Sequence, residues 1–98
     1  MAEKISRDRF ANLEDKEFIF HSEDGSELKL ELIEVSELKS FTKHEEYSLV
    51  FLAPPDSVLQ PFTYTLQHEE LGEIYLFLSP FWSDENGLKL EAAFSNLI

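Results

Sequence analysis

The side chains best suited to metal chemistry are three histidines, His21, His44 and His68. Two of them are each followed directly by two glutamates, and imidazole and carboxylate groups are both ligands of zinc. Their spacing does not fit a metal site, because the chain has no His-Glu-x-x-His sequence and no two histidines at strand spacing i, i+2. We expect structural or exposed roles, with His68 at a strand end bonding a turn carbonyl.

Other catalytic arrangements are also missing from the sequence. Paired carboxylates can act as acid and base, but twenty acids among 98 residues make chance pairs unavoidable. No pair stands out among Glu31, Glu69, Glu73 and Glu91. The chain has no Gly-x-Ser-x-Gly, too few glycines for a phosphate-binding loop, and no cysteine for a disulfide or a thiolate. We therefore expect no enzyme, no cofactor and no metal.

An aromatic pair that follows Pro80 is the clearest candidate for binding. Phe81 and Trp82 could form a contact patch with Tyr75 or Tyr64, since tryptophan and tyrosine are enriched at interface hot spots. Alternatively, the pair packs over the end of the domain as part of a small core. The full set of candidate protein contacts adds the apolar chain end and an acidic rim: Phe81, Trp82, Leu97, Ile98, Glu69, Glu70 and Glu85.

The charge is strongly negative and unevenly distributed. The formal net charge is −12, while residues 1–9 carry +1 and residues 10–98 therefore carry −13. Such a surface repels phosphate backbones and argues against nucleic acid as a partner. It serves solubility, or it docks a basic partner. The first residues have no apolar run of a signal peptide, and no stretch reaches the ~20 apolar residues of a membrane helix. We expect a cytoplasmic protein with no membrane contact.

Alternation of apolar residues with a period of two predicts β-strands. It is clearest in the second half, at residues 62–67, 74–79 and 88–95, and it also marks residues 17–21, 28–35 and 47–53. Asp24-Gly25 and Asn86-Gly87 predict hairpin turns. In residues 28–35 the apolar parity changes, which indicates either a bulge near Ile33-Glu34 or a strand whose far end is covered on its other face. Residues 47–53 are apolar on both parities, so we expect that strand to be covered on both sides.

The remaining segments complete a single domain over residues 1–98, with residues 1–5 flexible. Residues 6–13 predict a short helix, with Ser6 as its N-cap and with Phe10 and Leu13 packed on the sheet. Residues 37–46 are polar and predict a loop with Phe41 tucked onto the core. The fold class is mainly all-β: a six-stranded antiparallel meander forming a small barrel or β-roll. Its first and last strands are the expected edges, so the protein is a monomer or a weak homodimer through an edge strand.

Five segments carry a resemblance to a known family: Tyr47-Ser-Leu-Val-Phe51, Tyr64-x-Leu-x-His68, Leu71-Gly72, Leu76-Phe77-Leu78-x-Pro80 and Glu91-Ala92-x-Phe94-x-Asn96. Through them, and over nearly its whole length, the chain resembles a bacterial family of short uncharacterised β-rich proteins, a domain of unknown function. The resemblance implies a stand-alone β-rich domain, often encoded beside phage-tail-collar-like proteins. It implies no activity. Leu90 stands where the family often has tyrosine or phenylalanine, and this chain is unusually acidic.

Three functions follow as hypotheses. The first is a non-enzymatic protein-interaction or assembly accessory domain, associated with a phage-tail-like structure. The second is a small-molecule binder or hydrolase at the mouth of a barrel, although six strands leave an interior that side chains normally fill. The third is an acidic decoy for a basic nucleic-acid-binding protein, whose binding would fall steeply with added salt.

Overall fold

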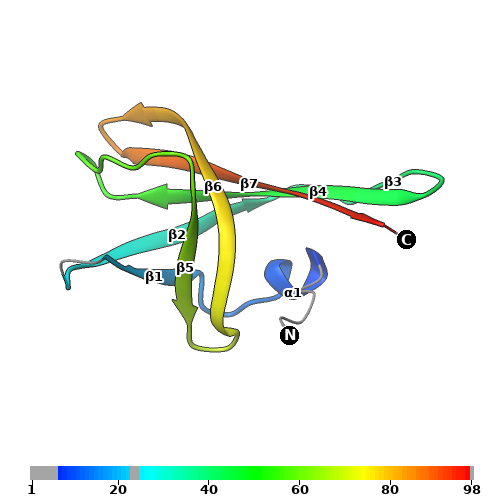
Figure 1. Ribbon diagram of the computed structural model, residues 1–98, viewed down its shortest axis with the longest axis horizontal. Coiled ribbons are helices and arrows are strands. Elements are labelled where there is room, and N and C mark those ends of the chain that lie inside the picture. The colour runs from blue at the N-terminus through cyan, green and yellow to red at the C-terminus, as the bar shows by residue number, and fades with distance from the viewer. Residues whose placement is uncertain (1–6, 23–24, 98) are drawn as a thin grey trace.

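The computed structural model describes residues 7–22 and 25–97, with the side chains of residues 96 and 97 left out. The chain folds into a β-barrel with one short helix at its side and an arm of strands projecting from it (Figure 1). Its elements in chain order are α1 (Arg7–Ala11), β1 (Glu17–His21), β2 (Glu27–Val35), β3 (Lys39–Ser40), β4 (His44–Ala53), β5 (Phe62–His68), β6 (Gly72–Asp84) and β7 (Gly87–Leu97).

The barrel is closed. The strand order is β2-β1-β5-β6-β7-β4-β3, and a further pairing of β2 with β4 joins the sheet to itself. Six strands therefore form the wall, β3 is an extra strand on β4, and all pairs are antiparallel. The prediction of a small six-stranded antiparallel β-barrel with a short N-terminal helix is confirmed.

The connectivity differs from a simple meander. After β4 the chain crosses to β5, which pairs with β1, and β4 instead pairs with β7 along its whole length. The expectation that the first and last strands are edges is therefore wrong for the barrel. β1 lies between β2 and β5, and β7 lies between β4 and the end of β6. Closure removes the edges because each wall strand gains a second neighbour.

Side chains fill the interior, as expected for six strands. The predicted alternation holds: Ile74, Leu76 and Leu78 of β6 are buried, whereas Tyr75 and Phe77 between them are exposed. Across the barrel, the rings of Phe18 and Phe51 meet edge to face with centroids 5.1 Å apart. The core includes Phe10, Phe18, Leu30, Leu32, Tyr47, Leu49, Phe51, Ala53, Tyr64, Leu66, Ile74, Leu76, Leu78, Leu90 and Ala92.

The helix α1 lies beside the barrel, in the open angle between β6 and the projecting strands β4 and β7 (Figure 1). Their pairing stops at Ser79 and Glu91, beyond which β6 continues beside β5 and β7 continues beside β4. Phe10 is fully buried and its ring lies 6.0 Å from that of Phe94, so the predicted packing of this segment is confirmed. The Arg7 side chain donates a hydrogen bond of 2.8 Å to the Ser36 carbonyl. The N-cap predicted at Ser6 lies outside the described residues.

Two irregularities shape the barrel wall. The β2–β4 register shifts between Leu32 and Glu34, which places the predicted bulge at Ile33. β6 does not end before Pro80, as proline normally suggests, but continues to Asp84 with a second shift between Pro80 and Trp82. Pro80 lies where β6 leaves β5 and joins β7. The strand therefore bends at the bulge rather than stopping.

The arm consists of β3, the first half of β4 and the last part of β7 (Figure 1). The predicted loop at residues 37–46 is therefore partly wrong, since it contains β3 and the start of β4. Phe41 does not tuck onto the core. It is 49% exposed and stacks on His44, with ring centroids 4.7 Å apart.

The buried tyrosine at the base of the arm makes stability depend on pH. Tyr47 stacks on Phe94 with ring centroids 4.6 Å apart. Burial, and to a smaller extent the nearby Glu45 carboxylate, raises the pKa of Tyr47 from 10.0 to about 12. Between these values the unfolded chain releases the phenolic proton while the folded chain keeps it. The free energy of unfolding contributed by this group is thus present below pH 10 and is lost as the pH rises toward 12.

We expect Tyr47→Phe to remove this component, because phenylalanine keeps the stacked ring without a titrating group. Urea unfolding of both proteins below pH 10 and near pH 12 measures it. The original protein should lose more stability over this interval than the variant. Parallel pH profiles would show that Tyr47 ionises alike in the folded and unfolded chains.

Candidate functional site

Four aromatic side chains on the outer side of β6 form the largest candidate contact surface, and we call Tyr75, Phe77, Phe81 and Trp82 the aromatic strip. Their exposed fractions are 59%, 55%, 56% and 56%. Tyr75 and Phe77 point outward because the alternating Ile74, Leu76 and Leu78 fill the barrel. The bulge after Pro80 leaves both Phe81 and Trp82 exposed. The alternative, in which Phe81 and Trp82 pack over the end of the barrel as part of the core, is wrong because both side chains are exposed.

The polar atoms of the strip are held by acids on the same strand. The indole Nε1 of Trp82 donates to Asp84 Oδ2 at 3.0 Å, and the Tyr75 hydroxyl donates to Glu73 Oε1 at 2.6 Å. The bond from Trp82, followed by that from the Asn86 N–H, lowers the pKa of Asp84. The bond to Glu73 raises the pKa of Tyr75. At neutral pH these bonds orient the rings, and the ring faces are left for a partner.

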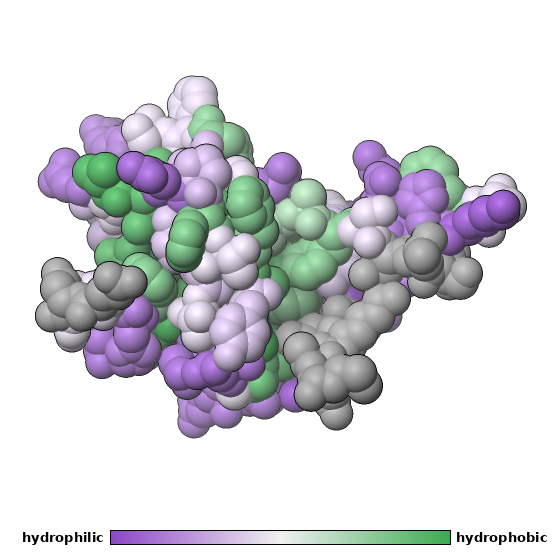
Figure 2. Space-filling model, in the orientation of Figure 1, coloured by the Kyte–Doolittle hydropathy of each residue, from purple (hydrophilic) through white to green (hydrophobic). Residues whose placement is uncertain are grey.

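On the β5 side the surface beside the strip is uncharged, which is unusual in a chain of net charge −12, whereas β7 places Lys89 opposite Trp82 and Glu91 opposite Ser79. Residues 74–83 of β6 and 62–67 of β5 contain no ionisable acid or base other than tyrosine. Apolar and weakly polar side chains gather over these two strands, and strongly hydrophilic residues lie mainly around them (Figure 2). The acids of the predicted rim stand beyond the two ends of β6. Glu69 and Glu70 precede it and Glu85 follows it, all three exposed.

The other residues that the sequence analysis named as candidate protein contacts do not belong to the aromatic strip. Leu97 ends β7 in the arm, away from β6, and Ile98 lies outside the described residues. Tyr64 is buried, and its hydroxyl donates to the Gln60 carbonyl at 2.6 Å, so it takes no part in the patch. Sequence reasoning missed Phe77 as a contact residue. Its signal was present, since Phe77 is a large apolar side chain on the outward parity of an alternating strand.

His68 has the structural role that its position at a strand end predicts. It is 5% exposed, and its Nε2 lies 2.6 Å from the Asp15 carbonyl, which places a donated proton on that nitrogen. Its Nδ1 accepts hydrogen bonds from the N–H groups of Glu70 and Leu71 at 3.0 and 3.3 Å. The imidazole thus ties the β5–β6 turn to the segment before β1. Its ring also packs on Phe18, with centroids 4.5 Å apart.

We expect His68→Ala to lower the free energy of unfolding by about 2–4 kcal/mol. The substitution leaves buried main-chain groups without partners and opens a cavity beside Phe18. The matched control is His21→Ala, since His21 is about half exposed and lies 3.7 Å from Glu27. That change should stay within about 0.5 kcal/mol. Urea denaturation of both variants measures the difference. Equal losses of unfolding free energy in the two variants would contradict a structural role for His68.

Within the part of the chain that the structure describes, the histidines lie apart from one another. His44 pairs with Glu46 at 3.2 Å on the arm, far along the chain and the sheet from His21 and His68. Over residues 7–22 and 25–97, no group of three or more His, Asp or Glu side chains is placed to hold a metal ion.

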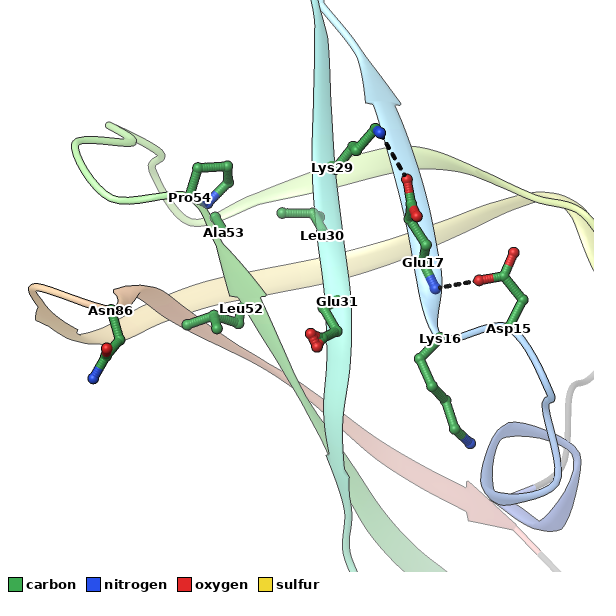
Figure 3. Close-up of a pocket in the computed structure, with 10 residues that line it drawn as sticks. All are labelled: Asp15, Lys16, Glu17, Lys29, Leu30, Glu31, Leu52, Ala53, Pro54 and Asn86. Atoms are coloured by element: carbon green, nitrogen blue, oxygen red, sulfur yellow. Dashed lines mark hydrogen bonds and ion pairs between the residues drawn. The ribbon is translucent and has the colours of Figure 1, made fainter.

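A shallow pocket of about 440 Å³ lies where β2 and β4 diverge (Figure 3). Apolar side chains form one side and charged ones the other, and its lining includes Lys29, Leu30, Glu31, Leu52, Pro54 and Asn86. Glu17 and Glu31 face each other in the β1–β2 register. The Glu17 carboxylate, however, turns toward Lys29, 3.3 Å away, and away from Glu31 (Figure 3). The two acids therefore do not form a pair around a common substrate position, and His68 does not line the pocket.

Comparison with known protein families agrees with the resemblance seen in the sequence. Residues 5–94 match the family described as a domain of unknown function, DUF6916. The chain belongs to this family. No curated protein and no solved structure matches it. The family description carries no activity, so the function has to be argued from the residues of this DUF6916 domain.

A separate finding concerns membranes. In the described part of this DUF6916 domain, no helix is both long enough and apolar enough to cross a membrane.

Proposed function

We propose that this DUF6916 domain is a non-enzymatic interaction module that binds a partner protein through the aromatic strip. The observation that carries the proposal is the exposure of four aromatic rings on one strand of a strongly acidic chain, in a stretch of β6 that itself has no charged residue. Exposed aromatic clusters of this kind, rimmed by polar residues, are typical of protein-binding sites. A filled barrel interior supports the same conclusion, because the domain then acts through its outer surface.

The charges around the strip define the kind of partner. Acids stand at both ends of β6, at Glu69, Glu70 and Glu73 on one side and at Asp84 and Glu85 on the other. A complementary partner carries an apolar patch with lysine or arginine on either side of it. The chemistry suits an assembly accessory role in a larger structure, and a phage-tail-like structure in the cytoplasm is the context we favour.

Affinity capture with matched variants tests this proposal. The strip variant is F77S/F81S/W82S, and the control variant I33S/L38S/F41S removes three other exposed apolar side chains, on β2 and the arm. We expect the original protein and the control to retain the same partner from native lysate, and the strip variant to lose it. With the purified partner, Trp82→Ala alone should weaken binding at least about tenfold. Equal retention by the strip variant would refute the assignment.

A second function has one observation in its favour, namely the pocket between β2 and β4 with its acids and lysines. A small polar ligand bound there would contact Glu31 and Lys16, and would leave the strip untouched. A ligand screen by NMR measures this directly. Chemical-shift changes confined to the pocket, and abolished by Glu31→Gln, would support the small-molecule function and would argue against the strip as the main site.

A further inference from the structure

The last part of β7 carries an open main-chain edge. β6 pairs with β7 only as far as Glu91, whereas β4 pairs with it through Leu97. On the side opposite β4, residues 92–97 have no strand partner among residues 7–22 and 25–97. The helix α1 meets this stretch through a side-chain contact between the rings of Phe10 and Phe94.

Apart from the helix α1 beside Phe94, this edge lacks the devices that normally protect an exposed strand. Proteins block pairing of such edges with lysine, proline, bulges or inward-pointing charges. Residues 92–97 contain no charged residue, no proline and no glycine, and the β4–β7 register runs through them without a shift. The other edge of the arm is different, because β3 has two residues and one of them is Lys39. The unprotected edge of β7 is therefore the place where another strand can add to this fold.

The charge of the arm indicates which molecule can pair with the open edge of β7. Residues 36–48 and 92–98 carry two lysines against three glutamates, a net charge of −1, which leaves −11 of the −12 for the rest of the chain. Two copies that meet through the acidic surfaces outside the arm and the aromatic strip bring like charges together, whereas two arms meet with little repulsion. We propose that residues 92–97 of β7 pair antiparallel with the same residues of a second copy of this chain. The result is a two-fold dimer with a sheet continuous through both arms.

A two-fold axis perpendicular to the sheet near Phe94 gives the register. It places Phe94 beside its own counterpart and Ala93 opposite Ser95 of the second copy. Ala93 and Ser95 are both exposed on the outer face, and Phe94 is half-buried on the inner face against Tyr47. The pairing adds main-chain hydrogen bonds and covers the remaining surface of Phe94. Two such short edges bury an area at the low end for specific interfaces, so the dimer is weak and depends on concentration.

Light scattering after size-exclusion chromatography tests the proposal on the full chain. We expect the apparent mass to rise from the 11.4 kDa of the monomer toward twice that value as the concentration increases. The variants A93K/S95K and A93E/S95E should each stay monomeric, because each places like charges opposite each other. An equimolar mixture of the two should recover the dimer, because lysine then faces glutamate across the axis. Circular dichroism confirms that each variant keeps the strand signal.

The control variant T63K/T65K places the same two charges on the outer side of β5, beside the aromatic strip. It should dimerise as the original protein does, so failure of the dimer and failure of the strip proposal are distinguishable. A chain that stays monomeric at all concentrations would overturn the inference. It would also be overturned by a dimer that the β7 variants leave intact or that T63K/T65K abolishes.

Discussion

Replacing Gly87 by alanine is expected to lower the free energy of unfolding by at least about 3 kcal/mol. Gly87 opens β7 with φ of +146°, in a region that residues with a Cβ rarely adopt. A Cβ at this position would overlap the carbonyl oxygen of Ala53 and would lie 2.9 Å from Cδ1 of Leu52. Because the conflicting oxygen is main chain of β4, relief requires movement of the β4–β7 pair that closes the barrel.

Gly72→Ala is the matched control. Gly72 also has a positive φ, +74°, but nothing lies within 4 Å of an added Cβ. It therefore carries the conformational cost without the overlap, and about 1 kcal/mol is expected. Chemical denaturation of both variants separates the two contributions. Equal stabilities would mean that β7 does not approach β4 as closely as the fold requires.

Phe51→Ala should cost about 3–5 kcal/mol of unfolding free energy. Phe51 is fully buried at the centre of the barrel, where its ring meets that of Phe18. Truncation removes the contacts of a large side chain, and the closed wall of paired strands limits how far the surroundings can collapse. With a usual stability of about 5–15 kcal/mol for a domain, this change consumes a large part of the total.

The comparison that makes this prediction specific is Phe77→Ala. The same residue type is removed there, but from the outer side of β6, where it is more than half exposed. A change of less than about 1 kcal/mol is expected. Thermal or urea unfolding of the pair measures the contrast. If Phe77→Ala proves as costly as Phe51→Ala, that ring packs against structure, and the aromatic strip is not a free surface.

The local features of the fold are readable in the sequence because they depend on neighbours along the chain. Alternation located the strands, Asn86-Gly87 located the β6–β7 turn, and the parity change near Ile33 located the bulge in β2. Closure is different. The pairing of β1 with β5 and of β4 with β7 joins segments far apart in sequence, and no local pattern specifies them.

The sequence did not predict the strands of the arm, and the reason is physical. Its strands project beyond the barrel, so neither face is fully buried, and Glu45 and Glu46 sit in a strand without the alternation that burial imposes. The length of β6 also exceeds the sequence prediction, because alternation marks only residues 74–79 and the strand continues to Asp84. Pro80 is tolerated within it because it lies at a bulged crossing between two partner strands, where a missing N–H costs little.

The sequence indicates part of the exposed aromatic surface. It combines Phe81 and Trp82 with Tyr75 or Tyr64, whereas the structure buries Tyr64 and adds Phe77 on the same strand. The acidic residues of the rim were proposed from the sequence alone. Only the fold shows that its members stand beyond the opposite ends of one strand, which gives the strip its polar border.

The chain contains a single tryptophan, so the fluorescence of Trp82 reports on the aromatic strip without labelling. Acrylamide quenching of Trp82, measured for the free domain and for its complex with the captured partner, tests the central claim most directly. The account predicts strong quenching in the free domain, because the side chain is 56% exposed, and marked protection in the complex. Protection already present in the free domain, or quenching that binding leaves unchanged, would contradict it.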